Sequence, residues 1–95
     1  MYVLVEKGAV GVHDVEDLKA FHVEVEPGLT DQELDDRLRA GDYGYVRDGR
    51  AFILVSRIRE SVTDVEGMAD MVDYAKSKGW VDQEGEALQA HIVRA

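Results

Sequence analysis

Three side chains suited to proton transfer or metal binding recur at every second position of one segment. His22, Glu24 and Glu26 fall in residues 21–26, which alternate apolar and polar types. In a strand this spacing puts them on one face, about 7 Å apart. An imidazole and carboxylates suit a divalent metal or an acid–base pair. One strand supplies at most two ligands to one ion at this spacing, so the polar face of a half-solvated strand is favoured. We expect no metal site and no cofactor.

His91 is a second histidine that could act together with these residues. It lies in the last predicted strand and approaches His22 if the first and last strands of the core unit are neighbours. The alternative hypothesis is therefore a small enzyme with His22 as general base and His91 as a second acid–base group. Tyr43 or Tyr45 would orient the substrate between two sheets. The leading hypothesis is a non-enzymatic interaction or small-ligand-binding module.

Large aromatic side chains gather on one predicted hairpin. Asp48-Gly49 is a type I′ turn pair flanked by residues typical of strands, which indicates a hairpin over residues 43–55. The two-residue turn sets Tyr45 opposite Phe52 and Tyr43 opposite Leu54. All four are predicted on the sheet side away from the helices, where they would leave an apolar patch. Monomers rarely expose a patch of more than a few hundred Å².

Three alternatives remain for what covers this aromatic sheet face. A second copy of the chain is favoured because symmetric contacts are the commonest. Residues 1–20 folding over the face, or a small molecule or protein partner, are the others. Arg47 and Arg50 face each other beside the turn, and like charges in that position are destabilising. We expect a nearby carboxylate to screen them; the alternatives are anion binding or ion pairs to Glu24 or Glu26 of a second copy.

The residues at 43–46 invite one family comparison. Tyr43-Gly44-Tyr45-Val46 resembles the centre of the aromatic RNA-binding motif of RRM domains, whose rings stack on bases. Asp42 stands where that motif has glycine after a basic residue. The net charge of −9 opposes binding to phosphate backbones and anionic membranes. The sequence therefore predicts neither a nucleic-acid nor a membrane partner.

The order of elements predicts the fold. Strands are expected at residues 2–6, 9–12, 21–26, 43–55 (a hairpin) and 86–94, and helices at 14–21, 30–41 and 63–79. From residue 21 onward this is the βαββαβ order of a ferredoxin-like α+β sandwich with both helices on one face. The chain is expected to be one domain, with residues 21–94 as the core and residues 1–20 as an extension. In an alternative threading, residues 2–6 form a central strand and one later strand is lost.

Helix ends are the clearest local signals. Thr30 with Glu33, and Thr63 with Glu66, are capping-box pairs. Gly41 and Gly79 are expected as left-handed stops. An apolar stripe should bury the second long helix, followed by Trp80 as a core anchor; the stripe comprises Val65, Met68, Ala69, Val72 and Ala75.

Composition limits the remaining classes. The 95 residues include no cysteine, which excludes disulfides, thiolate metal sites and cysteine nucleophiles. The short apolar run at residues 1–5 fits neither a signal peptide nor a membrane span. We therefore expect a cytoplasmic protein.

Overall fold

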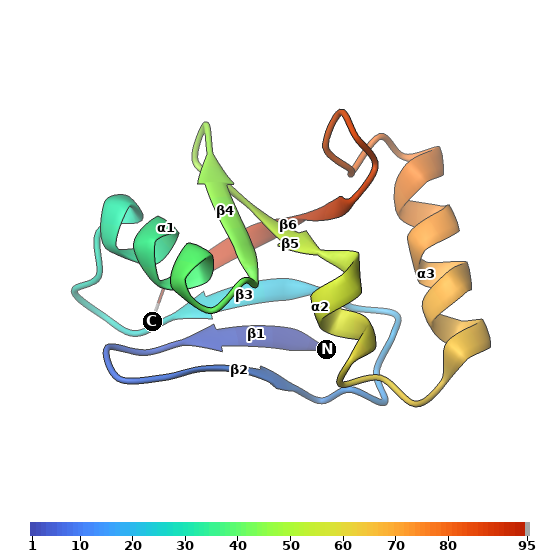
Figure 1. Cartoon of the computed structure of the whole chain (residues 1–95), viewed down its shortest axis with the longest axis horizontal. Helices are drawn as coiled ribbons and strands as arrows, with labels where there is room; N and C mark the ends of the chain where they lie inside the picture. The colour runs from blue at the N-terminus through green and yellow to red at the C-terminus, as the bar shows by residue number, and fades with distance from the viewer. Residues whose placement is uncertain (95) are drawn as a thin grey trace.

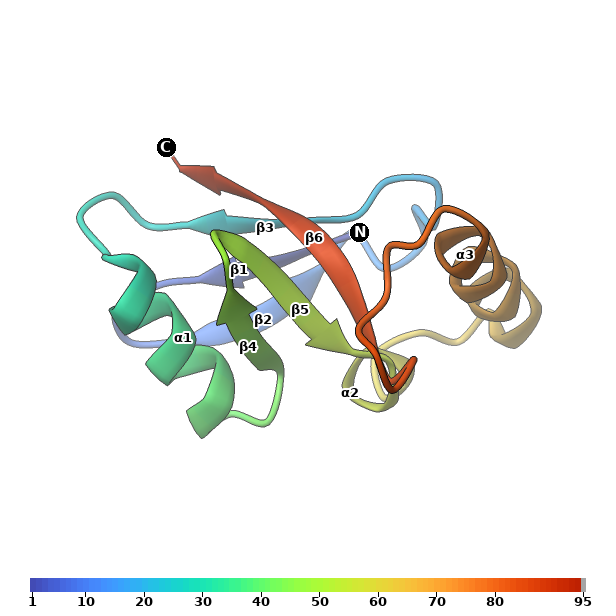
Figure 2. The same ribbon diagram turned by 90° about the horizontal axis from the view of Figure 1, so that it is seen from above.

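The computed structural model describes residues 1–94 and contains one strongly curled, six-stranded mixed sheet, a half-barrel, with three helices (Figure 1). The elements in chain order are β1 (Tyr2–Val5), β2 (Val10–His13), β3 (His22–Val25), α1 (Asp31–Ala40), β4 (Gly44–Arg47), β5 (Arg50–Leu54), α2 (Val55–Arg59), α3 (Val65–Ser77) and β6 (Ala87–Arg94). Helices α1 and α2 lie on one side of the sheet, and α3 lies at its end (Figure 2).

The sheet order is β2-β1-β3-β6-β5-β4. Strand β1 pairs antiparallel with β2 and parallel with β3, and β3 pairs parallel with β6. Strands β6, β5 and β4 are antiparallel neighbours. Residues 1–20 therefore extend the sheet beyond β3 through β1 and β2, and β1 is an inner strand of the sheet.

The α+β class is confirmed, but the ferredoxin-like topology is wrong. In that topology the second helix joins two parallel strands that another strand separates. Here β5 and β6 are antiparallel neighbours, and β6 lies between β5 and β3. The physical reason is that β6 pairs with both β5 and β3, and the local sequence pattern does not specify pairings between segments so far apart. Residues 55–59 turn directly into α2, and α3 packs at the end of the sheet with only Met68, Val72 and Ala75 buried.

The predicted helix at residues 14–21 does not form. The segment consists of turns between β2 and β3, and Asp14 has a positive φ of 50°, which a helix start does not tolerate. The ammonium group of Met1 donates to the carbonyl oxygens of Asp17 and Ala20, at 2.6 and 3.0 Å. These bonds hold the turns beside the start of β1.

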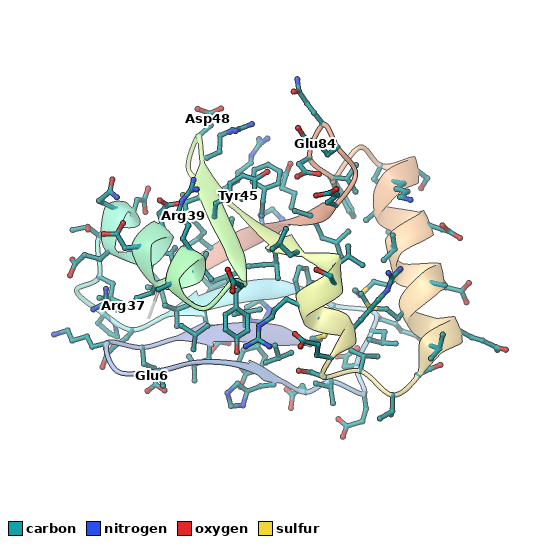
Figure 3. All side chains as sticks on the ribbon, in the orientation of Figure 1. Glu6, Arg37, Arg39, Tyr45, Asp48 and Glu84 are labelled. Carbon is teal, nitrogen blue, oxygen red and sulfur yellow. The ribbon has the colours of Figure 1, made fainter. Side chains whose placement is uncertain are left out.

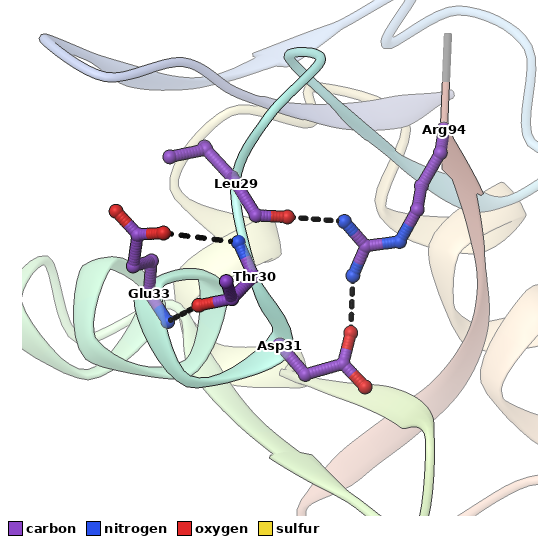
Figure 4. Close-up of polar contacts among 5 residues, drawn as sticks. All are labelled: Leu29, Thr30, Asp31, Glu33 and Arg94. Carbon is purple, nitrogen blue, oxygen red and sulfur yellow. Dashed lines mark hydrogen bonds and ion pairs between the residues drawn. The ribbon is translucent and has the colours of Figure 1, made fainter.

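Helix α1 begins as predicted. Thr30 Oγ1 accepts a hydrogen bond from the Glu33 backbone N–H, and Glu33 Oε1 accepts one from the Thr30 backbone N–H, both at 3.1 Å (Figure 4). The bond from the Thr30 N–H to the carboxylate lowers the pKa of Glu33. The helix end differs from the prediction. Gly41 has φ −95°, and the left-handed residue is Asp42 at φ 58°. Asp tolerates this region because its side chain bonds locally.

One carboxylate of α1 also binds the edge strand β4. Asp35 Oδ1 accepts from the Val46 N–H at 2.7 Å, and its other oxygen accepts from Arg39 Nε at 2.8 Å. Partial burial raises the pKa of Asp35, but these bonds outweigh that effect and leave the pKa below its ordinary value. Helix α1 thus satisfies a donor on β4, which as an edge strand has no further strand to bond it.

The β4–β5 hairpin has the predicted turn. Asp48 and Gly49 both have positive φ, 53° and 77°, as a type I′ turn requires. Gly44 departs from strand geometry with φ 154°, and a Cβ at that position would lie 1.8 Å from the carbonyl oxygen of Phe52. Only glycine permits this approach of β4 to β5.

Helix α3 corrects three expectations. Its N-cap is Asp64, whose side chain accepts from the Gly67 N–H at 2.9 Å, so Thr63 is not the cap. Val65 is 77 % exposed in the first turn, Ala69 is also exposed, and Trp80 is 44 % exposed rather than a core anchor. Gly79 does end the helix with a positive φ of 75°.

The core lies between the concave side of the sheet and the helices. One set of alternating residues in and beside the strands is buried or packed against the core there. They are Phe21, Val23, Val25, Gly44, Val46, Ala51, Ile53, Val55, Leu88, Ala90 and Ile92. Leu29 and Leu34, on either side of the α1 cap, are buried with them.

Gly44→Ala should destabilise the protein by at least about 2–3 kcal/mol, because the added methyl meets backbone and the positive φ is strained for alanine. Urea unfolding measures the change. Gly8→Ala is the control, since a Cβ at Gly8 has no neighbour within 4 Å, and it should change stability by less than about 0.5 kcal/mol. Equal stability of the two variants would contradict this reading of Gly44.

Candidate functional site

A row of rings crosses the outer face, the sheet side opposite α1 and α2. Tyr2 of β1 stacks between His13 of β2 and His22 of β3, with centroid distances of 5.3 and 5.1 Å and ring planes within 15°. His91 of β6 pairs with His22 in register, so the predicted approach of these two histidines is confirmed. Sequence reasoning did not anticipate Tyr2, because residues 1–20 were treated as an extension.

His22 has a carboxylate partner on its own strand. His22 Nε2 lies 2.9 Å from Glu24 Oε1, and both side chains are about one-third exposed, at 29 % and 43 %. Glu26 instead accepts from the backbone N–H of Lys7 at 2.8 Å. Within residues 1–94, no three His, Asp or Glu side chains converge as ligands of one metal ion would.

The predicted pair Tyr45 and Phe52 is confirmed, and residues of the chain itself contact it. The two rings stack with centroids 5.3 Å apart, and Tyr45 Oη donates to Asp82 Oδ2 at 3.1 Å. The guanidinium groups of Arg39 and Arg47 lie 5.5 and 5.4 Å from the Tyr45 centroid; Figure 3 labels Arg39 and Tyr45. Cations at this distance attract the face of a tyrosine ring.

The Tyr45–Asp82 bond changes the pKa of both groups. Partial burial, and then the bond to Asp82, raise the pKa of Tyr45. Partial burial also raises the pKa of Asp82, but N–H donors from Ala87 and Glu86 outweigh it and hold the pKa below its ordinary value. Asp82 therefore connects the residue 82–87 turn to the aromatic pair.

Tyr43 is not on the outer face, which corrects the prediction. Its ring packs against the core, its hydroxyl donates to the Val10 carbonyl at 3.2 Å, and the Arg57 guanidinium lies 4.3 Å from the ring centroid. Leu54 is half-buried and immediately precedes α2. The predicted four-residue patch thus loses Tyr43, and the stacked pair of Tyr45 and Phe52 is its aromatic part.

The two arginines predicted beside the turn contact different parts of the structure. Arg47 and Arg50 are paired in register as predicted, but Arg47 lies over the Tyr45 ring and Arg50 borders a groove described below. Residues 1–20 do not fold over Tyr45 and Phe52, because β1 and β2 continue the sheet on the far side of β3. That covering is excluded.

An open groove of about 1050 Å³, here called the α3 groove, lies between α3, the turns before β3, and β6. Its walls are the segment 16–21, one face of α3, and the side chains where β6 and β5 meet. The lining residues are Glu16, Asp17, Leu18, Lys19, Ala20, Phe21, Arg50, Asp64, Gly67, Asp70, Met71, Tyr74, Ala75, Trp80, Leu88, Gln89 and His91.

Backbone contacts hold the groove at Trp80 and at Gly67. The Trp80 N–H donates to the Ala75 carbonyl and the Trp80 carbonyl accepts from the Gln89 N–H, both at 2.9 Å. At the other end, a Cβ on Gly67 would lie 2.7 Å from Leu18 Cδ1, so the bare glycine lets the segment 16–21 reach α3. The groove is therefore framed by secondary structure.

Exposed rings form part of the groove. Tyr74 is 58 % exposed and Trp80 44 %, and their rings meet edge to face with centroids 5.8 Å apart. Half-buried Phe21 and Met71 add apolar surface. Sequence reasoning missed Met71 and Tyr74; their spacing of three on α3, followed by Trp80, is a second apolar stripe beside the one assigned to the core.

Of the predicted site residues, His91 and Arg50 line the α3 groove, whereas His22 and Glu24 lie on the open outer face. A smaller hollow of about 380 Å³ on that face includes Leu4, Glu24 and Val93. In residues 1–94 no helix has the length and apolar content to cross a membrane.

Asp82→Asn should cost about 1 kcal/mol at pH 7, because the ionised carboxylate accepts from two backbone N–H groups and the Tyr45 hydroxyl. The folded pKa lies below the unfolded value of about 3.9, so this stabilisation exists above that pH and is lost as the pH falls through the folded pKa. Urea unfolding at pH 7 and pH 3 should show the difference shrinking at low pH. A constant difference, or an equal loss in Asp73→Asn on exposed α3 surface, would contradict the assignment.

Comparison of the chain with protein families, with curated proteins and with solved structures found no match. Any function must therefore be argued from the site itself.

Proposed function

We propose that the protein is a small-ligand-binding module whose site is the α3 groove. The observation that carries the proposal is the groove itself: about 1050 Å³ of open space lined by half-exposed rings and by polar groups. Ligand sites in proteins are concave, rich in apolar and aromatic side chains, and contain a few polar groups that orient the ligand. The α3 groove has this composition.

The proposed site differs from the aromatic sheet face that the sequence predicted. The Tyr45 and Phe52 rings stack on each other, and Tyr45 also contacts two guanidinium groups and Asp82. These contacts leave less of the ring surface for a ligand. Trp80 and Tyr74 keep about half of their surface open. Exposed aromatic surface framed by backbone costs little ordering on binding, so the groove is the better candidate.

The enzyme alternative has less support. It requires His22 and His91 to act on one bound substrate. His91 borders the α3 groove, whereas His22 is held by Glu24 and stacked on Tyr2 outside the groove lining. A ligand in the groove would meet one of the two histidines.

The single tryptophan makes the proposal testable, because Trp80 gives one indole N–H signal and it lies in the groove. Small aromatic compounds that bind should shift that signal and the amide signals of residues 16–21 and 67–75 in NMR spectra. Met71→Lys should abolish the shifts by putting a charge on the apolar wall. Val65→Lys, a 77 % exposed position on the same helix outside the groove, should keep them. Shifts confined to other surfaces, or equal binding by Met71→Lys, would overturn the proposal.

We also propose that the protein forms a homodimer through the outer face. Leu4, Tyr2 and Val93 provide apolar surface there, and helices α1 and α2 lie on the opposite side of the sheet (Figure 2). Val93 is 46 % exposed at the end of β6, beside Glu24 in register. A second copy would remove this surface from water by a symmetric contact.

Sedimentation at micromolar concentration tests the dimer. The unaltered protein and Val65→Lys should sediment as dimers, because Val65 lies on α3 away from the outer face. Val93→Lys should be monomeric, since its ammonium would be buried in the contact, while the folded monomer tolerates lysine next to Glu24. A monomeric unaltered protein would reject the dimer without affecting the groove.

A further inference from the structure

The charges and rings of the α3 groove point to the chemistry of its ligand. We infer that it binds a small organic cation, an amine or quaternary ammonium with an aromatic or apolar body. This inference rests on the proposed ligand-binding function and adds the sign of the ligand's charge.

Carboxylates stand on two walls of the groove. The segment 16–21 contributes one pair and α3 the other, so a ligand between the walls meets negative charge from both sides. The acidic lining residues are Glu16, Asp17, Asp64 and Asp70, against the cations Lys19 and Arg50. With histidine neutral the lining has a net negative charge, in a chain whose net charge is −9. Such a field concentrates cations in the groove and repels anions.

On α3, the Tyr74 ring and the Asp70 carboxylate could both contact the same bound cation. Asp70 and Tyr74 are four residues apart, so they lie on the same face of the helix, and both line the groove. Lys78 Nζ lies 5.6 Å from the Tyr74 centroid, but the ring is still 58 % exposed and keeps surface for a second cation. The edge of Trp80 adjoins the same ring. Rings next to a carboxylate favour ammonium groups by cation–π attraction.

The apolar surface decides against a metal ion. Phe21, Met71 and Leu88 line the groove together with the charged residues. Across residues 1–94 the acidic and histidine side chains are not grouped in threes around a common point, as strongly hydrated divalent ions need. Dispersed carboxylates together with apolar surface suit a weakly hydrated cation whose body displaces water from the rings.

Three probes of similar size and different charge test the inference: 2-phenylethylamine, 2-phenylethanol and 3-phenylpropanoate at pH 7. Their affinities are measured by titration of the Trp80 fluorescence, which reports on the groove alone because the chain has one tryptophan. We expect the amine to bind at least about ten-fold more tightly than the alcohol, the propanoate to bind most weakly, and the preference to fall in 1 M salt.

Paired variants assign the preference to the groove. Asp70→Asn should weaken amine binding by roughly three- to ten-fold and leave alcohol binding unchanged, since it removes a charge without removing apolar surface. Asp73→Asn changes the same charge on the same helix outside the lining and should leave both affinities unchanged. Equal affinities for the three probes, tightest binding of the propanoate, or equal effects of the two variants would overturn the cation inference while the ligand-binding proposal stands. Failure of all three probes to change the Trp80 signal would overturn both.

Discussion

The whole sheet depends on one strand that pairs in two directions. The first half of β6 pairs antiparallel with β5, and its second half pairs parallel with β3, so β6 alone joins β2-β1-β3 to β5-β4. Arg94, at the end of the strand, donates to the Leu29 carbonyl and pairs with Asp31 at the start of α1 (Figure 4). Leu88 and Ala90, in the half of β6 that pairs with β5, are buried in the core. Like β1, β6 therefore has one antiparallel and one parallel neighbour, and it holds the two halves of the curled sheet together.

The curl is also held at the two edges of the half-barrel. Gly44 lets β4 approach β5, and the preceding Tyr43 leaves the outer face, crosses to the β2 edge and donates to the Val10 carbonyl. Arg57 of α2 lies on the Tyr43 ring and donates to the Gly41 carbonyl at 3.3 Å. One tyrosine thus connects both edge strands and a helix. A glycine in a conformation closed to other residues and an aromatic side chain together turn an open sheet into a half-barrel.

The α3 groove follows from the same topology. Since β6 inserts next to β5, α3 packs at the end of the sheet, and only Met68, Val72 and Ala75 are buried. Its neighbouring face stays open toward the turns before β3 and toward Trp80, which the bond to Gln89 holds beside β6. A helix placed over the sheet would have hidden these rings in the core. The groove is therefore a consequence of strand order, and its acidic character comes from the surrounding surface residues.

The sequence alone determined those local features that depend on neighbouring residues. The Thr30–Glu33 capping box, the Asp48-Gly49 turn and the Tyr45–Phe52 register depend on a few consecutive residues, and the structure confirms each. Alternation likewise identified β3 as a strand with one buried face, whereas the pairing of His22 with His91 depended on strand order. Tertiary structure alone decided strand order, the inward turn of Tyr43 and the exposure of Trp80. These depend on contacts between segments far apart in the chain, such as β6 with β3 and Tyr43 with Val10, which periodicity does not encode.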